Sequence, residues 1–467
     1  MAHGKLGYRA DIAFDGEQAI TGGALVLVED GVIIGVEPGS APAPDGWQVT
    51  YLPGTAMLPG LIDAHSHLCG NGQPDALDRL PRLSPDDLDE AVEAALTAHL
   101  AAGVTAVRDL GDHRWAVVDR HRKRPDGPTV VAAGPPITSA GGHCASMGGE
   151  ASGVGELRRA VRERADRGAD LVKIMTSGGV MTAGTDIRAC QYWLEELVAV
   201  VDEAHRLGLP VTAHAHALAA VQQCVTAGVD GIEHCSCIGK RGMHTPPELA
   251  SAIAAADIAV CPTLGHDMSQ MAGPLPPAMA AAVKRSGVTL EQRLAQVGEL
   301  HRGGVTLVSG VDSGIHPLKA HGTLPLAVIE LAVAGAPPTT ALASATGLAA
   351  RACGLADRTG RLRTGLDADL LLVDGDPTTD ITALRNLRTV VSRGQATHPN
   401  RTPDLAHQTD PNQNRHPTVT PARMAPLTGR SVRPGCCRFI IDLQRILGRE
   451  TVERPRSVGG FGSSVGS

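Results

Sequence analysis

Eight short apolar segments recur through the middle of the chain, and stretches with helical spacing separate them. The segments lie at 57–62, 104–110, 129–133, 170–175, 210–214, 229–234, 258–262 and 305–310. Helical patterns lie between them, for example at 192–207 and 217–227. Strands that alternate with helices are typical of a parallel sheet, because each parallel strand needs a crossover connection. We therefore predict an α/β fold in which eight strands close into a (β/α)8 TIM-like barrel, with its chemistry at the carboxyl ends of the strands.

The two sides of this region carry a different pattern. Residues 1–58 and 361–397 contain short apolar runs that turn residues interrupt, and the Asp-Gly pair at 30–31 is a strong hairpin signal. We expect these segments to build one small β-sandwich beside a catalytic domain at 59–360. Residues 398–467 are rich in Pro, Thr, Asn and Arg without periodicity, which predicts a disordered tail.

The composition argues against several classes of protein. At 467 residues the chain can bury a large core, and 43% of it is hydrophobic although aromatic residues make up only 2%. The 49 acidic residues outnumber the 42 basic ones, which argues against nucleic acid as a partner. No apolar run has the length of a membrane span, and the N-terminus lacks the apolar segment of a signal peptide. We therefore expect a cytoplasmic protein with no membrane partner.

The segment PGLIDAHSH at 59–67 places two histidines after the first strand. Successive side chains of a strand point to opposite faces, so His65 and His67 share one face. Two imidazoles at a strand end can begin a divalent metal site, although two hydrogen-bonded polar residues would show the same spacing. The fifth strand repeats the pattern with His214 and His216. Strand alternation does not decide which of these two would bind a metal.

Lys173 is one of only six lysines, and it lies inside the apolar run 171–175. A charged lysine within a buried strand is costly unless it is paired or neutralised. Burial lowers the pKa of the amine and makes it nucleophilic. From the residues alone, Lys173 could be a Schiff-base lysine, a paired structural lysine or, after reaction with carbon dioxide, a carbamate that bridges two cations.

Two further ligand types end other strands, His234 the sixth and Asp312 the eighth. A single histidine at a strand end is more often a hydrogen-bonded loop residue, and an aspartate there is often a helix N-cap. These residues nevertheless occur together with Lys173 and two His-x-His pairs, at strands one, four, five, six and eight. The combination predicts a site for two divalent ions about 3.5–4 Å apart.

These motifs resemble those of the metal-dependent amidohydrolase superfamily, in particular the imidazolonepropionase-like branch that includes prolidase-like dipeptidases. The resemblance covers residues 8–395. It rests on an ordered set of segments: PGLIDAHSH at 59–67, GVTAVRD at 103–109, GGH at 141–143, VKIMTSGG at 172–179, the His214 segment, IEH at 232–234, GVDSG at 310–314 and the closing segment 365–376.

The resemblance implies six ligands for two divalent metal ions: His65, His67 and Asp312 for the more buried ion, His214 and His234 for the second, and carboxylated Lys173 as a bridge. Zinc is the expected metal, with manganese, iron or cobalt as alternatives. A metal-bridging hydroxide would attack an amide-type C–N bond, and Asp312 would take the proton and deliver it to the leaving nitrogen. The expected small-molecule substrate is a dipeptide, an N-acyl amino acid or a cyclic amide.

Four further residues are candidates for substrate binding: His143, Arg188, His216 and His321. His143 could donate to a carboxylate or carbonyl or stabilise its loop, and Arg188 could clamp a carboxylate or remain solvated. His216 stands where prolidase-like relatives often have a tyrosine that contacts substrate. The alternatives are a related deaminase or lactonase on the same barrel and a non-catalytic paralogue. The sequence also leaves a homo-oligomer open.

Overall fold

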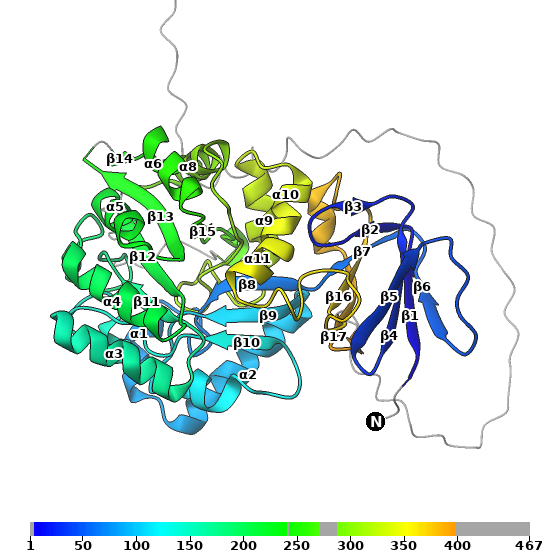
Figure 1. The fold of residues 1–467 in the computed structure, drawn as a ribbon, viewed down its shortest axis with the longest axis horizontal. Coiled ribbons are helices and arrows are strands. Elements are labelled where there is room, and N and C mark those ends of the chain that lie inside the picture. The colour runs from blue at the N-terminus through cyan, green and yellow to red at the C-terminus, as the bar shows by residue number, and fades with distance from the viewer. Residues whose placement is uncertain (1–3, 241, 271–286, 398–467) are drawn as a thin grey trace, which may run out of the picture. The chain divides into compact units, whose positions relative to one another are not determined.

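The structure is a computed structural model that describes residues 4–240, 242–270 and 287–397. The tail predicted at 398–467 lies outside these residues. The fold is mixed α/β: in Figure 1, strands β8 to β15 lie among helices, whereas β1, β4, β5 and β6 form a region without helices.

Two sheets make up the β-rich region. One has the order β5-β4-β1-β6, with β1 at Leu6–Ala10, β4 at Ala24–Glu29, β5 at Val32–Pro38 and β6 at Gln48–Tyr51. The other has the order β18-β17-β16-β7-β2-β3, with β2 at Ile12–Phe14, β3 at Ala19–Ile20, β7 at Thr55–Pro59, β16 at Leu370–Asp374, β17 at Leu387–Ser392 and β18 at Gln395–Thr397. The second sheet thus joins strands from segments more than 300 residues apart, because β7 pairs with β16.

The hairpin predicted at 30–31 is confirmed. Strands β4 and β5 pair antiparallel on either side of Asp30 and Gly31, whose φ angles are 52° and 81°. A two-residue turn with positive φ at both positions matches the twist of the strands that it joins. One hydrophobic cluster contains side chains of both sheets, such as Val26 of β4 and Leu370 of β16, so the two sheets share a core.

The helix-covered region contains parallel strands in two sheets. One has the order β10-β9-β8, and in the other β11, β12 and β13 are neighbours and β15 pairs with β13. The strands are β8 at Leu61–Ser66, β9 at Val104–Asp109, β10 at Thr129–Ala132, β11 at Val172–Met175, β12 at Val211–Ala217, β13 at Gly231–Gly239 and β15 at Ala259–Cys261; the two-residue β14 at Gly242–Met243 pairs antiparallel with β13. Each of the first seven predicted segments therefore contains a strand.

The first predicted strand, at 57–62, is wrong as a single element, because the apolar run belongs to two strands. β7 ends at Pro59 in the β-rich region, and β8 begins at Leu61 among the parallel strands. Gly60 lies at the crossing, where it donates its N–H to Asp369 O at 2.9 Å. A Cβ atom on Gly60 would lie 2.1 Å from Thr105 Oγ1, so the chain can pass here only as glycine.

The eighth predicted strand, at 305–310, is not a regular strand. Its only bridge is a parallel one between Leu307 and Val260. Ser309 donates its N–H to Ser344 O at 2.7 Å rather than to a neighbouring strand, which interrupts the ladder. Its carbonyl still accepts the N–H of Ala64 in β8 at 3.0 Å.

Isolated parallel bridges also connect the sheets beyond their regular strands. Ile137, which follows β10, bridges Ile174 of β11. Ser66 of β8 bridges Ser313, just beyond the eighth segment. Each parallel strand group is therefore hydrogen-bonded to the next segment at both of its edges.

Helices connect the strands and cover them (Figure 1). They are α1 at Ala76–Arg79, α2 at Pro85–Ala101, α3 at Val154–Arg167, α4 at Leu194–Arg206, α5 at Leu218–Ala227, α6 at Pro247–Ala255, α8 at Leu290–Arg302, α9 at Leu324–Val333, α10 at Pro338–Ser344 and α11 at Gly347–Ala352. The helices predicted at 192–207 and 217–227 are confirmed as α4 and α5. A separate hydrophobic cluster gathers Ile62, Ala106, Val131 and Cys261 from four strands with Ala350 of α11, so α11 packs against side chains of these strands.

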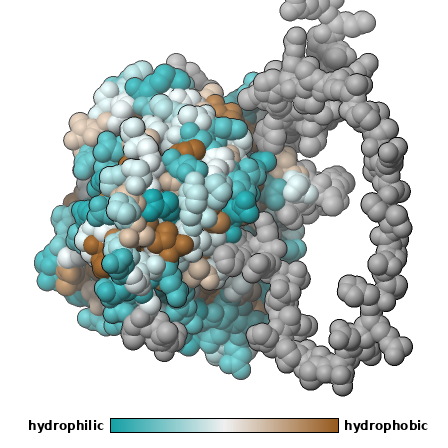
Figure 2. All heavy atoms as spheres, turned by 90° about the vertical axis from the view of Figure 1, so that its right-hand side faces the viewer, coloured by the Kyte–Doolittle hydropathy of each residue, from teal (hydrophilic) through white to brown (hydrophobic). Residues whose placement is uncertain are grey.

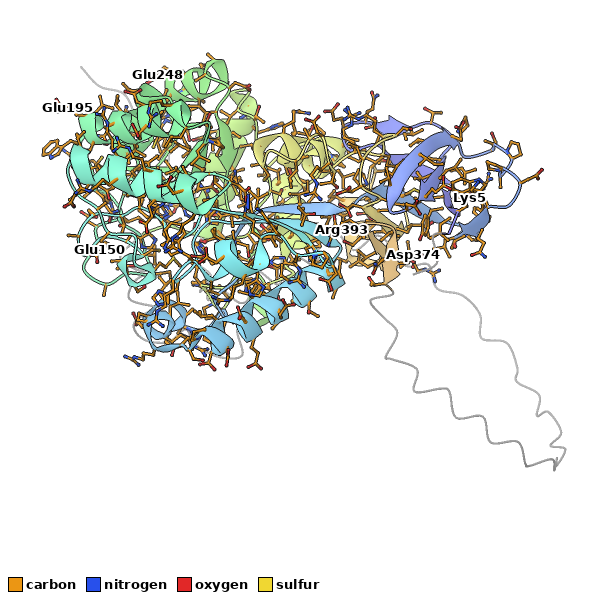
Figure 3. The ribbon with its side chains drawn as sticks, turned by 60° about the horizontal axis from the view of Figure 1, so that its bottom comes forward. Lys5, Glu150, Glu195, Glu248, Asp374 and Arg393 are labelled. Carbon is orange, nitrogen blue, oxygen red and sulfur yellow. The ribbon has the colours of Figure 1, made fainter. Side chains whose placement is uncertain are left out.

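Polar and hydrophobic side chains both occur on the outside of the described residues. Figure 2 shows one face, on which hydrophobic residues occur in small groups among hydrophilic ones. In Figure 3, Glu195 of α4 and Glu248 of α6 lie at the periphery of the helical region. None of the described helices combines the length and the hydropathy that crossing a membrane requires.

Replacing Ser84 with alanine should lower the free energy of unfolding by about 1 kcal/mol. Ser84 begins α2 with a capping box, in which its hydroxyl accepts the N–H of Asp87 at 3.2 Å and the Asp87 carboxylate accepts the N–H of Ser84 at 3.0 Å. Urea titration at unchanged m-value measures the effect. The matched control is Ser251→Ala, an exposed serine inside α6, with an effect below about 0.5 kcal/mol. Equal effects of the two variants would show that the cap contributes nothing.

Candidate metal centre

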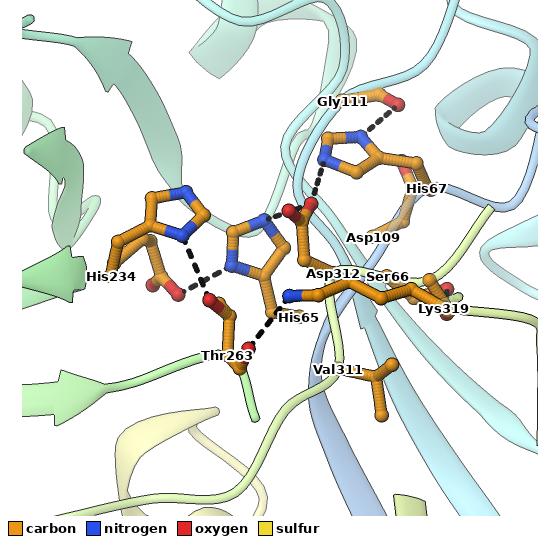
Figure 4. A network of polar contacts seen from close by, with 12 residues as sticks. His65, Ser66, His67, Asp109, Gly111, His234, Thr263, Val311, Asp312 and Lys319 are labelled. Atoms are coloured by element: carbon orange, nitrogen blue, oxygen red, sulfur yellow. Dashed lines mark hydrogen bonds and ion pairs between the residues drawn. The ribbon is translucent and has the colours of Figure 1, made fainter. Parts of the chain in front are cut away.

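His65, His67 and Asp312 lie together at the carboxyl end of β8. Asp312 Oδ1 is 3.3 Å from His65 Nε2 and 3.2 Å from His67 Nε2, as Figure 4 shows. Asp312 also donates its N–H to His65 O at 2.7 Å, and His67 donates its N–H to Ser313 O at 2.9 Å. Backbone hydrogen bonds thus fix the carboxylate beside the two imidazoles.

The second ring nitrogen of each imidazole determines which atoms face Asp312. His65 Nδ1 donates to the Glu233 carboxylate at 2.7 Å, and His67 Nδ1 donates to Gly111 O at 3.1 Å. In a neutral imidazole the other nitrogen then carries a lone pair. Two such lone pairs point at a carboxylate oxygen that is itself an acceptor. Three acceptors at this spacing need a proton or a cation between them, and this donor set fits a divalent metal ion.

A second group contains His214 and His216 of β12 and His234 of β13. One ring nitrogen from each residue lies within 4.8 Å of the others. The ring centroids of His214 and His234 are 4.6 Å apart, and those of His65 and His234 are 5.4 Å apart. The second group therefore adjoins the first.

Each imidazole of the second group has one polar partner. His214 Nε2 donates to Gly178 O at 3.2 Å, His216 Nδ1 lies 2.9 Å from Ser236 Oγ, and His234 Nδ1 lies 2.8 Å from Thr263 Oγ1. Each ring keeps its other nitrogen for a ligand. Strand alternation left His214 and His216 equivalent, and the structure brings both into the group.

Burial keeps the imidazoles of the second group neutral. Desolvation lowers the pKa of His216 to about 3 and holds the pKa of His214 and His234 well below the usual value, and the neighbouring imidazoles add to the effect. In Asp312, burial acts to raise the pKa, but the charge of His65 and the hydrogen bonds of His65 and His67 outweigh it and hold the pKa well below the ordinary value. The second group thus supplies neutral imidazoles, and Asp312 stays an ionised carboxylate beside them.

Lys173 lies on β11 and is 1% exposed. Its Nζ has no hydrogen-bond partner among the residues that the structure describes. Burial lowers the pKa of the amine, and the charges of Glu233 and Asp312 oppose that shift only in part. A buried amine without a partner is costly, so its occurrence beside two groups of potential ligands requires an explanation.

The structure adds Glu233, which motif spacing missed. Its Oε2 accepts from His65, and its Oε1 accepts from Arg108 at 3.0 Å and from Thr212 at 2.6 Å. Alternation along β13 would place Glu233 and His234 on opposite faces. His234 has a φ of 65°, which redirects the strand so that both side chains reach the centre. In the sequence, only the position of Glu233 next to His234 within the IEH segment pointed to a role for Glu233.

Asp63 is a second residue at the centre that the sequence motifs did not single out as a site residue. Its Oδ1 accepts the N–H of His65 and that of Val311, both at 3.1 Å. Burial raises the pKa of Asp63 to about 7, against the effect of these two hydrogen bonds. Asp63 thus ties the strand that carries the first histidines to the segment that carries Asp312.

The four candidates for substrate binding lie in different surroundings. His216 belongs to the second group, and the ring of His143 lies 4.6 Å from that of His214. His321 lies behind Asp312, where Nε2 donates to Gly70 O at 2.9 Å and Nδ1 is 3.2 Å from Ser313 Oγ. Arg188 is exposed in the segment between β11 and α4.

Comparison with known proteins gives a family and several relatives. The model of the Amidohydrolase family matches residues 56–397. Ochratoxinase from Aspergillus niger is 29% identical over 245 residues, which are 51% of this chain and 48% of that protein, so the chain spans about half the length of this curated relative. The structure of a Xaa-Pro dipeptidase with bound methionine in the active site has a TM-score of 0.73 at 24% identity and covers 84% of this chain and 100% of its own. An amidohydrolase structure has a TM-score of 0.73 at 27% identity, with 84% and 99% covered.

Proposed function

Since the chain belongs to the amidohydrolase family, we propose that it is a binuclear metal-dependent hydrolase that cleaves an amide-type C–N bond in a small molecule. The convergence of two histidine groups with Asp312 supports this proposal, and so does the buried, unpartnered amine of Lys173, whose pKa responds to the charges of Glu233 and Asp312. Binding of two divalent ions at one centre would explain all of these features together.

We also infer that the parallel strands close into a TIM-like barrel. The bridges from Ile137 to Ile174, from Val260 to Leu307 and from Ser66 to Ser313 support closure, because they connect the strand groups in a ring. In this proposal the barrel comprises residues 59–360, and residues 1–58 and 361–397 build the β-sandwich.

In the proposed centre, six side chains would hold two divalent ions: His65, His67 and Asp312 one ion, His214 and His234 the other, and Lys173 both. Lys173 would do so as a carbamate. Its unprotonated amine attacks carbon dioxide, a nitrogen–carbon bond forms and one amine proton leaves, which gives an anion with two oxygen ligands. The low pKa that burial imposes on Lys173 favours the unprotonated amine that this step needs.

When bound, the ions would supply Lewis acidity and lower the pKa of a shared water towards neutrality. Asp312 would accept a proton at its carboxylate and deliver it to the leaving nitrogen. Its depressed pKa keeps it in the ionised form that can accept the proton. His143, which adjoins the second group, and His216, which belongs to it, would orient the substrate carbonyl or carboxylate. Glu233 would hold the imidazole of His65 in the required tautomer.

We infer the substrate class from the relatives. The names of a Xaa-Pro dipeptidase and of ochratoxinase favour dipeptides and N-acyl amino acids, and cyclic amides complete the set. The test is a hydrolysis screen of the zinc- or manganese-loaded enzyme against Xaa-Pro dipeptides, acylated amino acids, cyclic amides and lactones. We expect turnover of at least one amide. Exclusive turnover of lactones, or deamination without amide cleavage, would contradict the proposal.

Replacing Glu233 with glutamine should weaken metal binding about 10- to 100-fold. The amide is a poorer acceptor for His65 Nδ1–H and leaves the charge of Arg108 unpaired. Competition with a chelator measures the affinity. The control is Glu299→Gln, which removes the charge of a carboxylate that accepts from the Thr245 N–H at 2.8 Å. We expect this variant to bind metal like the wild type, and equal losses in both variants would refute a specific role for Glu233.

A further inference from the structure

A cavity of about 510 Å³ lies at the amino-terminal side of β10 and β11. Its walls come from residues 129–131, from Asp170 and Leu171 before β11, and from residues 352–355 at and after the end of α11. None of the histidines of the proposed metal centre lines it. The cavity is therefore a separate feature of the same fold.

Basic side chains dominate its lining. Six of them contribute to it: Arg108, Arg122, Lys123, Arg124, Arg358 and Arg393. Asp170 is the one acidic residue among the lining residues. The whole chain carries a formal charge of −7, so this concentration of positive charge runs against its average. We call it the basic cavity.

Some of these charges are paired within the fold. Arg122 Nε donates to Asp170 at 2.9 Å, and Arg358 Nη2 donates to Asp367 at 2.8 Å. Arg124 binds Glu93 through two nitrogens, at 2.8 and 3.1 Å. These pairs order three guanidinium groups at the cavity without filling it.

Two cations that line the cavity, Arg393 and Lys123, form no ion pair with a carboxylate among the residues that the structure describes. Arg393 comes from the turn between β17 and β18 and is labelled in Figure 3. Its Nη2 donates to Gly127 O at 2.7 Å and its Nη1 to Arg124 O at 3.3 Å. Carbonyl oxygens orient a guanidinium without cancelling its charge. Lys123 is exposed and forms no ion pair with any other residue in the described part of the chain.

We propose that the basic cavity binds a small multivalent oxyanion, which carries phosphate or carboxylate groups. Guanidinium groups that are held in place by neighbours match the oxygens of such an anion in pairs. An anion would also offset the repulsion among cations that the fold holds together. The volume is sufficient for a small organic ligand.

Arg108 joins the basic cavity to the proposed metal centre. Its Nη1 donates to Ala352 O at 3.1 Å on the cavity side, and its Nη2 donates to Glu233, which accepts from His65. The Arg108 guanidinium already donates to Ala352 O and to the Glu233 carboxylate. Lys123 and Arg393, which have no carboxylate partner, are therefore the groups that would bind the anion most directly.

Isothermal titration of inorganic pyrophosphate and of citrate into the metal-loaded full chain tests the proposal, with ionic strength held constant by chloride. Lys123→Glu should weaken binding about tenfold or more, because it replaces a charge-assisted contact with repulsion. Lys123→Ala should have a smaller effect of the same sign. The matched control is Arg158→Glu, an exposed residue of α3 outside the cavity, with a change below about twofold.

A larger loss of pyrophosphate than of citrate affinity in Lys123→Glu would assign a phosphate-bearing ligand, and the reverse a carboxylate-bearing one. Both anions also bind divalent metal ions, so the variants identify the site. Equal affinities of Lys123→Glu and Arg158→Glu would place the anion elsewhere and overturn the proposal. Absence of binding for both anions would overturn it as well.

Discussion

Asp312→Asn should lower kcat/KM about a thousandfold while the fold stays intact. The amide keeps the size of the carboxylate but cannot accept and return a proton, and such proton transfer contributes roughly 10²- to 10⁴-fold to rates. Asp312 has a φ of 66°, which asparagine also adopts readily, so the backbone is not strained further. Kinetics on a substrate from the screen, metal analysis and a thermal unfolding midpoint measure the effect. We expect the ions to be retained at saturating metal concentration.

The matched control for this variant is Asp257→Asn. Asp257 also has a positive φ, 52°, but it is exposed at the end of α6. The same chemical change in the same backbone conformation should leave kcat/KM unchanged. An Asp312→Asn variant as active as this control would remove Asp312 from the mechanism.

Lys173→Met should abolish activity and yet should not destabilise the metal-free protein. Methionine has no amine that could become the proposed carbamate, so the two ions lose the ligand that they would share. In the metal-free protein it also removes a buried amine without a partner, and an unsatisfied buried polar group costs about 1–3 kcal/mol. We therefore expect a metal-free variant with a free energy of unfolding equal to or above that of the metal-free wild type. Metal analysis and urea titration of both forms provide the measurements.

Lys5→Met serves as the control, because Lys5 is exposed in the β-rich region and lies 5.9 Å from the ring of Trp47. It should keep both ions and full activity. Two results would contradict the role of Lys173. A variant that retains two ions and activity has no need of the amine, and a metal-free variant that unfolds far more easily would make Lys173 a structural residue.

The sequence allowed six of the eight strand positions to be predicted as single strands, since each of these coincides with an apolar run between turn residues. The run at 57–62 misled because hydrophobicity continues across Gly60 while the chain changes sheets. The segment 305–310 misled in the opposite way. Its composition suits a strand, but the hydrogen bond from Ser309 to Ser344 diverts its ladder, and local composition does not report a tertiary partner.

Spacing along strands was sufficient for His65 and His67, which lie side by side near Asp312. It could not identify Glu233, because the left-handed backbone at His234 breaks the alternation on which that reasoning depends. It could not separate His214 from His216 either, since both reach the same group. Positions that depend on backbone deviations become visible only in three dimensions.

The hydroxyls of Ser66 and Ser313 lie 2.9 Å apart although 247 positions separate them in the chain. Asp312 therefore meets the first two histidines only after nearly the whole helix-covered region has been synthesised and folded. A ribosome-bound chain that stops short of residue 312 would carry the early imidazoles but no carboxylate opposite them. Stable binding of an ion at this end would therefore indicate that the region has finished folding. Truncated chains would reveal the length at which ion binding first appears.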